Sequence, residues 1–190
     1  MTNKMKIGLF GGVFNPPHLG HLMVTQQILD FTDINEVWFL PNYGQHPPKP
    51  HVAGVADRLA MTRMLVLAKT RVATLEIDKK LDGNTIDLLP HLPKENTYTF
   101  IMGADWLASF RLWGQWEKLL EKLPFLVFPR NGYPNVPLYK NMKLLEHELL
   151  ITTNISATRI RERVKNNLSI EQFVPEEIAD YIKKRNLYAA

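Results

Sequence analysis

The chain has 190 residues, of which 45% are hydrophobic and 22% are charged, a composition that disfavours disordered, collagen-like and disulfide-scaffold proteins. The absence of cysteine excludes disulfides, a thiolate nucleophile and cysteine-based zinc or iron–sulfur sites, and it fits a reducing cytoplasm. The formal net charge of +4 favours anionic ligands. Because the charges are scattered, they suit a phosphorylated small molecule and do not specifically indicate nucleic acid.

The amino-terminal stretch predicts neither a membrane span nor an export signal. Two lysines precede an apolar run, but glycines and prolines interrupt that run well short of the length that crosses a bilayer, and no small-residue cleavage site follows. We therefore expect a cytoplasmic protein with no membrane partner.

Short apolar runs alternate with longer amphipathic segments along the chain, which is typical of an α/β domain. The runs predict strands at Ile7–Phe10, Val37–Leu40, Val72–Ile77, Tyr98–Gly103, Phe125–Pro129 and Leu149–Thr152. The intervening segments predict helices that include Gly20–Phe31, Asp57–Lys69, Trp106–Leu112 and Pro175–Asn186. The segments Pro41–Pro50 and Asn131–Lys143 are expected to be surface excursions long enough to carry function.

The strand candidates are apolar on both faces, which favours a doubly wound, mostly parallel sheet with helices on both faces. Ligands of such folds bind beyond the carboxyl ends of the strands, where the strand order reverses. Residues that directly follow strands are therefore the functional candidates.

The strongest local pattern lies in residues 11–21, GGVFNPPHLGH, which we call the early segment. Gly11 and Gly12 have no Cβ atoms, so their backbone N–H groups can approach a phosphate or nucleoside closely. His18 and His21 lie three residues apart at a predicted helix start, which places both imidazoles on one side of an anion-binding helix end. Each feature alone is explained by a tight turn or by ordinary histidines, but their combination favours a phosphate site.

Residues 155–161, ISATRIR, follow the last predicted strand, and we call them the late segment. Ser156 is a good N-cap for a helix that contains Arg159 and Arg161. A capped helix with a basic exposed face is one interpretation of this segment. The other is a receptor for β- and γ-phosphates, made from N–H groups, hydroxyls and a guanidinium at one helix start.

Together the two segments resemble the nucleotidyltransferases with HxGH and ISxTxIR signatures. The early segment is most similar to the GGTFDPxHxGH loop of the bacterial nicotinate mononucleotide adenylyltransferases, and the late segment matches the second signature. The resemblance implies one Rossmann-like nucleotidyltransferase domain over residues 1–190, with a helical C-terminal part from about residue 156. The chain departs from the family pattern at Asn15, where the family usually has an aspartate.

The resemblance further implies adenylyl transfer from ATP to nicotinate mononucleotide, which gives deamido-NAD and pyrophosphate in NAD biosynthesis. It assigns the catalytic role to His18 and His21. It assigns ATP contacts to Gly11, Gly12, Val13, Phe14, Lys49, Asp105, Ile155, Ser156, Thr158 and Arg161. It assigns acceptor contacts to Asn42, Thr85, Ile86, Trp113 and Arg130. Mg²⁺ is expected to bind mainly through the ATP phosphates, with no dedicated protein metal site, and a homo-oligomer is left open.

Several of these residues also have a plain structural interpretation. Asp105 could N-cap the helix 106–112, Trp113 could be a core tryptophan, Thr85 could simply start a helix, and Arg130 could be an exposed loop arginine. The register of Lys49 within His46–Lys49 differs from the family's PPHK-type loop. The stretch Asp57–Met61 also resembles a family segment, but a helix with a buried apolar face accounts for it, so no chemistry is assigned there.

Other functions remain open at this point. The same chemistry could act on nicotinamide mononucleotide, phosphopantetheine or another phosphorylated acceptor, or use CTP for cytidylyl transfer. A non-catalytic nucleotide-binding module would bind ATP without releasing pyrophosphate. A metal-dependent hydrolase would hold zinc or iron, but no third His, Asp or Glu stands at the usual ligand spacing from the histidine pair. Neither GxGxxG nor a Walker motif is present.

Overall fold

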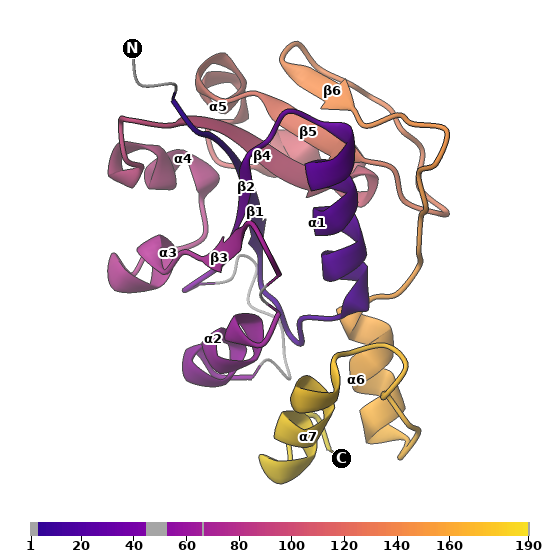
Figure 1. Ribbon diagram of the computed structural model, residues 1–190. Helices are drawn as coiled ribbons and strands as arrows, with labels where there is room; N and C mark the ends of the chain where they lie inside the picture. The colour runs from indigo at the N-terminus through magenta and orange to yellow at the C-terminus, as the bar shows by residue number, and fades with distance from the viewer. Residues whose placement is uncertain (1–3, 45–52, 66, 190) are drawn as a thin grey trace.

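A computed structural model describes residues 4–44, 53–65 and 67–189. Its strands form one parallel sheet in the order β3-β2-β1-β4-β5-β6. The chain builds β1, β2 and β3 outward in one direction and then returns to place β4 on the other side of β1 (Figure 1). The predicted doubly wound parallel sheet is confirmed, and its strand order reverses between β1 and β4.

The strands occupy the apolar runs that the sequence predicts, with two exceptions given below. Their bounds are β1 Lys6–Gly12, β2 Glu36–Pro41, β3 Thr70–Val72, β4 Thr97–Gly103, β5 Phe125–Phe128 and β6 Met142–Leu144. Leu9 in β1 pairs with Trp38 in β2 and with Phe100 in β4. Helices bury both faces of these inner strands, which is why their sequences are almost continuously apolar.

Helices cover both faces of the sheet (Figure 1). Their bounds are α1 Leu19–Phe31, α2 Val55–Arg63, α3 Leu75–Asp78, α4 Thr85–Leu88, η1 Leu89–His91, η2 Ala104–Leu112, α5 Trp116–Lys122, α6 Ala157–Lys165 and α7 Glu176–Lys184. Ile28 of α1 packs with Ile101 and Leu126 on one face. Phe110 of η2 and Leu119 of α5 pack with Leu9, Phe100 and Phe125 on the other.

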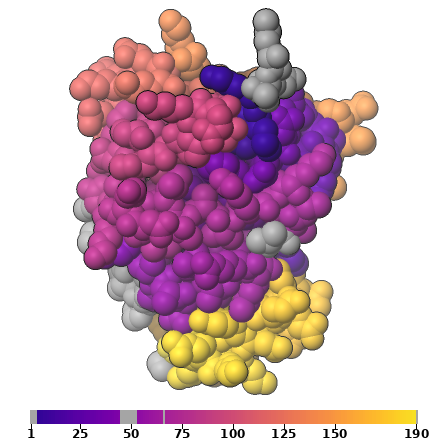
Figure 2. Space-filling model, turned by 60° about the vertical axis from the view of Figure 1, so that its left-hand side comes forward, coloured from indigo at the N-terminus to yellow at the C-terminus, as the bar shows by residue number. Residues whose placement is uncertain are grey.

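The C-terminal helices lie beyond the carboxyl ends of the strands (Figure 1). Ile160 of α6 and Ile178 and Ile182 of α7 share a buried cluster with Phe14 and with Met61 of α2. Figure 2 shows this C-terminal segment, in yellow, seated against the purple α2 region. The last helices are thereby packed onto the edge of the sheet where a ligand is expected.

The prediction of a strand over Val72–Ile77 is wrong beyond Val72, because residues 75–78 form the helical turn α3. The N–H of Asp78 donates to the carbonyl of Thr74 at 2.8 Å, and the Thr74 hydroxyl donates to the Asp78 carboxylate at 2.7 Å. These local bonds offer the backbone an alternative to a ladder at the edge of the sheet.

The prediction of a strand over Leu149–Thr152 is also wrong. Instead, the sixth strand is β6, which begins at the end of the segment 131–143 that was expected to be a surface excursion. Gln27 of α1 binds the backbone of Ile151 on both sides: its Nε2 donates to the carbonyl at 2.9 Å, and its Oε1 accepts the N–H at 2.6 Å. A side-chain amide thus takes the bonds that a neighbouring strand would have made.

Helix boundaries follow the local chemistry. The helix predicted over Asp57–Lys69 begins at Val55 and ends at Arg63. The Thr70 hydroxyl bonds both backbone groups of Leu67, and Lys69 has a positive φ of 58°, so the chain turns before β3. The helix predicted over Pro175–Asn186 is confirmed as α7, and it carries Glu176 and Glu177 in its first turn and Lys183 and Lys184 in its last, which complements the helix dipole. In the described part of the chain, no helix is long and apolar enough to cross a membrane.

Candidate active site

The early segment forms the turn from β1 into α1, and His18 is the N-cap of that helix. The backbone N–H of His18 donates to Nδ1 of His21 at 3.0 Å. The two imidazole centroids lie 3.8 Å apart with an interplanar angle of 31°. The prediction that both imidazoles project from one side is confirmed.

Both histidines are neutral at pH 7. Burial lowers the pKa of His21 to about 3 and the pKa of His18 well below its usual value, and the nearby positive charge of Arg130 lowers both further. Since Nδ1 of His21 accepts a hydrogen bond, its proton is on Nε2, which is therefore a donor. The buried Nδ1 of His18 has no hydrogen-bond partner within the described ranges.

Gly20 makes the close packing of this pair feasible. A Cβ at Gly20 would lie 2.9 Å from Nδ1 and 3.0 Å from Cε1 of His18, which is too close for a carbon atom. Elsewhere in a helix interior, alanine would be more stable than glycine by about 1 kcal/mol. The glycine of the HxGH pattern thus makes room for the first histidine.

Two aromatic rings pack against the imidazole of His21. The Phe14 centroid lies 4.9 Å and the Phe10 centroid 5.7 Å from the imidazole. Phe14 adopts a left-handed backbone conformation, with φ of 49°, which costs a non-glycine residue on the order of 1–3 kcal/mol. The turn is therefore a strained conformation that its surroundings hold in place.

The late segment meets the early segment directly. The Arg161 guanidinium donates through Nη1 to the carbonyl of Asn15 at 2.8 Å and through Nη2 to the Thr158 hydroxyl at 3.3 Å. The predicted N-cap is confirmed, because the Ser156 hydroxyl accepts the N–H of Arg159 at 3.3 Å. Ile155 lies partly buried beside these groups, in the cluster that contains Phe14.

Gln27 fixes the approach to the late segment, and sequence reasoning missed it. It is 8% exposed and ties α1 to Ile151, just before the late segment. Thr153 then passes next to Gly20, since its Cγ2 lies 3.5 Å from where a Gly20 Cβ would be. No signal in the sequence pointed to this role, because the burial of Gln27 becomes visible only in the structure.

Asp105 and Arg130 face one another at the carboxyl ends of β4 and β5. Nη1 of Arg130 donates to the Asp105 carboxylate at 2.6 Å, and both side chains are largely buried. The N-cap of the helix that contains Asp105 is Gly103, so the N-cap interpretation of Asp105 is wrong. Because Arg130 also acts electrostatically on His18 and His21, this ion pair borders the histidine pair.

Apart from Arg130, the residues expected on the acceptor side lie on adjoining turns. Cβ positions built on the glycines between them show this: one at Gly83 would lie 3.5 Å from Nδ2 of Asn42, and one at Gly114 would lie 2.8 Å from Oδ1 of Asn84. Thr85, at 9% exposure, is the first residue of α4, with Ile86 next to it.

Trp113 is the C-cap of η2, and its side chain also makes the contacts of a core residue. Its ring is 5.7 Å from that of Phe100 and 5.2 Å from that of Phe110, centroid to centroid. The two interpretations of Trp113 are therefore compatible, because it lies at the edge of the core and next to the 84–85 turn through Gly114.

Arg58 connects the two halves of the site, although no chemistry was assigned to its segment. Its guanidinium donates to the carbonyls of Val13 at 2.9 Å, Asn42 at 2.7 Å and Tyr43 at 3.3 Å. It is 2% exposed, and fully buried arginines are rare, but this burial is visible only in the structure. The same side chain thus links the turns after β1 and β2.

Gly11 has a second role besides the one predicted from its lack of a Cβ. A Cβ there would lie 2.8 Å from the ring of Phe100, so packing in the core also requires this glycine. Gly12 ends β1, and its carbonyl accepts the N–H of Asn42 at 3.0 Å. Lys49, with the rest of His46–Lys49, lies outside the described residues.

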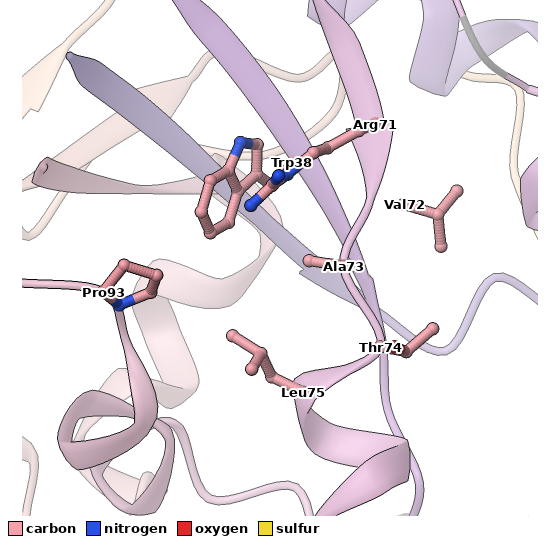
Figure 3. A pocket seen from close by; sticks show the side chains of 7 residues that line it. All are labelled: Trp38, Arg71, Val72, Ala73, Thr74, Leu75 and Pro93. Carbon is pink, nitrogen blue, oxygen red and sulfur yellow. The ribbon is translucent and has the colours of Figure 1, made fainter.

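A cavity of about 240 Å³ opens elsewhere, at the β2–β3 edge of the sheet (Figure 3). It is lined by Trp38, Arg71, Val72, Ala73, Thr74, Leu75 and Pro93, and none of these is a predicted site residue. Its polar groups are already partnered, since Arg71 lies 3.5 Å over the Trp38 ring and both contact Glu36. Across residues 4–44, 53–65 and 67–189 no group of three or more His, Asp or Glu side chains could hold a metal ion.

Comparison with known proteins places the chain among nucleotidyl-transfer enzymes. The cytidylyltransferase-like family model matches residues 9–163. A relative from Geobacillus kaustophilus, named "Probable nicotinate-nucleotide adenylyltransferase", is 33% identical over 97% of this chain and 87% of its own length. The nicotinic acid mononucleotide adenylyltransferase of Plasmodium falciparum has a similar fold, with TM-scores of 0.80 in its complex with NaAD and 0.76 in its complex with APC. Each comparison has 22% identity and covers 97% of both chains.

Proposed function

The chain belongs to the cytidylyltransferase-like family and within it to the nicotinate-nucleotide adenylyltransferases, and on that premise we propose that it joins ATP and nicotinate mononucleotide into deamido-NAD. The observation that supports this best is the bond from Arg161 to the carbonyl of Asn15. It brings the late segment against the turn that carries His18 and His21, so that groups from both ends of the chain can surround one triphosphate.

The reaction needs alignment more than it needs a protein nucleophile. An oxygen of the acceptor 5′-phosphate attacks the α-phosphorus of ATP; the new P–O bond forms as the bond from the α-phosphorus to the bridging oxygen of the β-phosphate breaks, and pyrophosphate leaves with that electron pair. A phosphate monoester is already ionised near neutral pH. The enzyme's task is to align two polyanions and to neutralise the charge of the transition state.

His21 is the proposed donor to the α-phosphate. Its Nε2–H is held by the bond at Nδ1 and by the rings of Phe10 and Phe14. Because burial keeps the imidazole neutral, it stabilises developing charge through a fixed N–H dipole. The ring of His18 stacks on that of His21, and because its Nδ1 is buried against Gly20, its other ring nitrogen, Nε2, is the one proposed to bind a second phosphate oxygen.

The late segment is proposed to hold the leaving pyrophosphate. Ser156 and Thr158 supply hydroxyls, and the described bonds of Arg161 use two of its five N–H donors. Gly11, Gly12, Val13, Phe14 and Ile155 are proposed to line the nucleoside, and Asp105 to face it. Lys49 is proposed to bind an ATP phosphate.

The adjoining turns after β2 and before α4 are the proposed acceptor side, with Trp113 next to the pyridine ring and the Thr85–Ile86 turn beside it. Asn42 and Arg130 complete this set. Arg58 supports the proposal, because it ties the turn after β1 to the turn after β2 and so fixes the distance between the two substrates.

Mg²⁺ is proposed to enter with ATP, bound mainly to the phosphate oxygens. The one carboxylate described next to the histidine pair, that of Asp105, is already bonded to Arg130, and Mg²⁺ prefers oxygen ligands and keeps several waters. When bound, the cation would neutralise part of the triphosphate charge.

We further propose that residues 1–190 act as one domain whose helical part from about residue 156 completes the site. The cluster that joins α6 and α7 to Phe14 and Met61 supports this. The lack of cysteine supports a reducing, cytoplasmic setting.

The test is incubation of the purified chain with ATP and Mg²⁺ and, in parallel, with nicotinate mononucleotide, nicotinamide mononucleotide or phosphopantetheine. We expect pyrophosphate release with nicotinate mononucleotide and a product with the mass of deamido-NAD. Pyrophosphate release with another acceptor only, or with CTP in place of ATP, would contradict the assigned substrates. ATP binding without pyrophosphate release in every arm would contradict catalysis itself.

A further inference from the structure

The C-terminal end of the chain returns to the turn that carries the histidine pair. The Tyr188 hydroxyl donates to Oδ1 of Asn15 at 2.8 Å, across 173 residues of sequence. Tyr188 has a left-handed backbone, with φ of 65°, a conformation that costs an aromatic residue on the order of 1–3 kcal/mol. Such a conformation persists only where the surrounding structure stabilises it. The packing around the C-terminal segment therefore holds Tyr188 in this conformation and in contact with Asn15.

Asn15 is the point where three distant parts of the chain meet. Its Oδ1 accepts the N–H of Ala53 at 3.0 Å as well as the Tyr188 hydroxyl, and its carbonyl accepts the Arg161 guanidinium. The residue is 4% exposed and lies three positions before His18. Any movement of Asn15 therefore moves the histidine pair relative to the late segment.

The Tyr188 hydroxyl is protonated and so acts as a donor. Burial raises the pKa of Tyr188 above its usual value; the positive charges of Arg161 and Arg58 lower it in part, and the negative charge of Asp57 raises it. A neutral phenol between two guanidiniums can donate to the asparagine oxygen without adding charge beside the site.

We propose that Tyr188 is a positioning residue for adenylyl transfer: its hydroxyl holds Asn15, and through Asn15 it sets the distance between the histidine pair and Arg161. This inference rests on the proposed function. It predicts that loss of one hydroxyl, far from the reacting atoms in sequence, slows the reaction. A misplacement of about 1 Å can cost up to a hundredfold in rate.

The chain offers a matched control in Tyr181, whose hydroxyl donates to the Asp57 carboxylate at 2.9 Å and makes no bond to the early segment. Y188F and Y181F each remove one tyrosine hydroxyl from the C-terminal segment. We expect Y188F to lower kcat about five- to tenfold with the KM for nicotinate mononucleotide within about twofold of wild type, and Y181F to keep kcat within about twofold. Equal kcat values for the two variants would overturn the proposal.

A double-mutant cycle tests whether Tyr188 acts through Asn15. We expect N15A/Y188F to be no slower than N15A alone, because the hydroxyl has lost the group on which it acts. Multiplicative losses in the double variant would show an independent role and overturn the proposal.

Hydrogen exchange separates this inference from the proposed function, since it requires no turnover. We expect the backbone amides of residues 13–20 to exchange at least about threefold faster in Y188F than in Y181F or wild type. Equal exchange would overturn the positioning role even in an active enzyme. If the wild type releases no pyrophosphate but this difference is present, the proposed function fails and the contact between Tyr188 and the turn stands.

Discussion

The His21 imidazole is packed among aromatic rings, yet it is oriented by a single backbone bond to Nδ1. Removing the side chain therefore takes away one N–H donor with few other polar contacts. Oxyanion-type donors of this kind contribute a factor of about 10²–10³ to kcat. We therefore expect His21 to contribute mainly to stabilising the transition state and little to the free energy of unfolding.

We expect H21A to reduce kcat by about two to three orders of magnitude while the free energy of unfolding falls by no more than about 2 kcal/mol. Steady-state pyrophosphate release and urea denaturation measure the two effects. His147 is the control, since it is exposed and stacks on Phe31 at 3.9 Å; H147A should retain the wild-type kcat. An H21A enzyme with a near-normal rate would remove His21 from the mechanism.

Glu76 shows how a single buried carboxyl can influence stability. It is 4% exposed, and its Oε2 has no partner within the described residues. Burial raises its pKa to about 7; Asp82 raises it as well, and the charge of Arg58 lowers it. Because the folded-state pKa is above the unfolded value, this group stabilises the fold fully below about pH 4.5, and the contribution is lost as pH rises through about 7.

The variant E76Q removes that titration. We expect the free energy of unfolding of E76Q, relative to wild type, to rise by about 1–3 kcal/mol between pH 5 and pH 8, because only the wild type must ionise a buried carboxyl. Urea denaturation at both pH values measures it. E121Q, at an exposed position of α5, should show no such change, and a pH-independent difference for E76Q would contradict the buried-charge account.

At the scale of elements, the errors of sequence-based prediction share one physical cause. Residues 149–152 have the pattern of a strand, but a single side chain on α1 satisfies the backbone of Ile151. Residues 75–77 are apolar enough for a strand, but Thr74 and Asp78 close a helical turn. Local pattern identifies segments that could form strands, while the partner that takes their backbone hydrogen bonds is decided by tertiary structure.

The Gln27 contact predicts a measurable coupling between α1 and the late segment. We expect Q27L to raise the KM for ATP several-fold and to lower the free energy of unfolding by about 1–3 kcal/mol, because the backbone of Ile151 loses two hydrogen bonds to the Gln27 amide. Q26L is the control: Gln26 is the exposed neighbour that bonds Asp30. If the two variants have the same KM for ATP, the late segment does not depend on this clamp.

At the scale of the whole molecule, the sequence was sufficient to predict the parallel sheet, the capped start of α6 and the paired imidazoles. The resemblance of the two segments to two signatures of one family also predicted that they lie together, and the bond from Arg161 to Asn15 brings them into contact. The contacts that assemble the site could not be predicted. Arg58 binds carbonyls, and Tyr188 binds an asparagine 173 residues away; neither contact has a local pattern.

The central claim is that the early and late segments bind the same triphosphate. A crystal structure of the full chain with Mg²⁺ and a non-hydrolysable ATP analogue tests it most directly. We predict phosphate oxygens within about 3 Å of an imidazole of the histidine pair and, on the same triphosphate, of a hydroxyl or guanidinium of the late segment. A triphosphate that contacts one segment alone, or that binds at the Trp38–Arg71 cavity, would contradict the account.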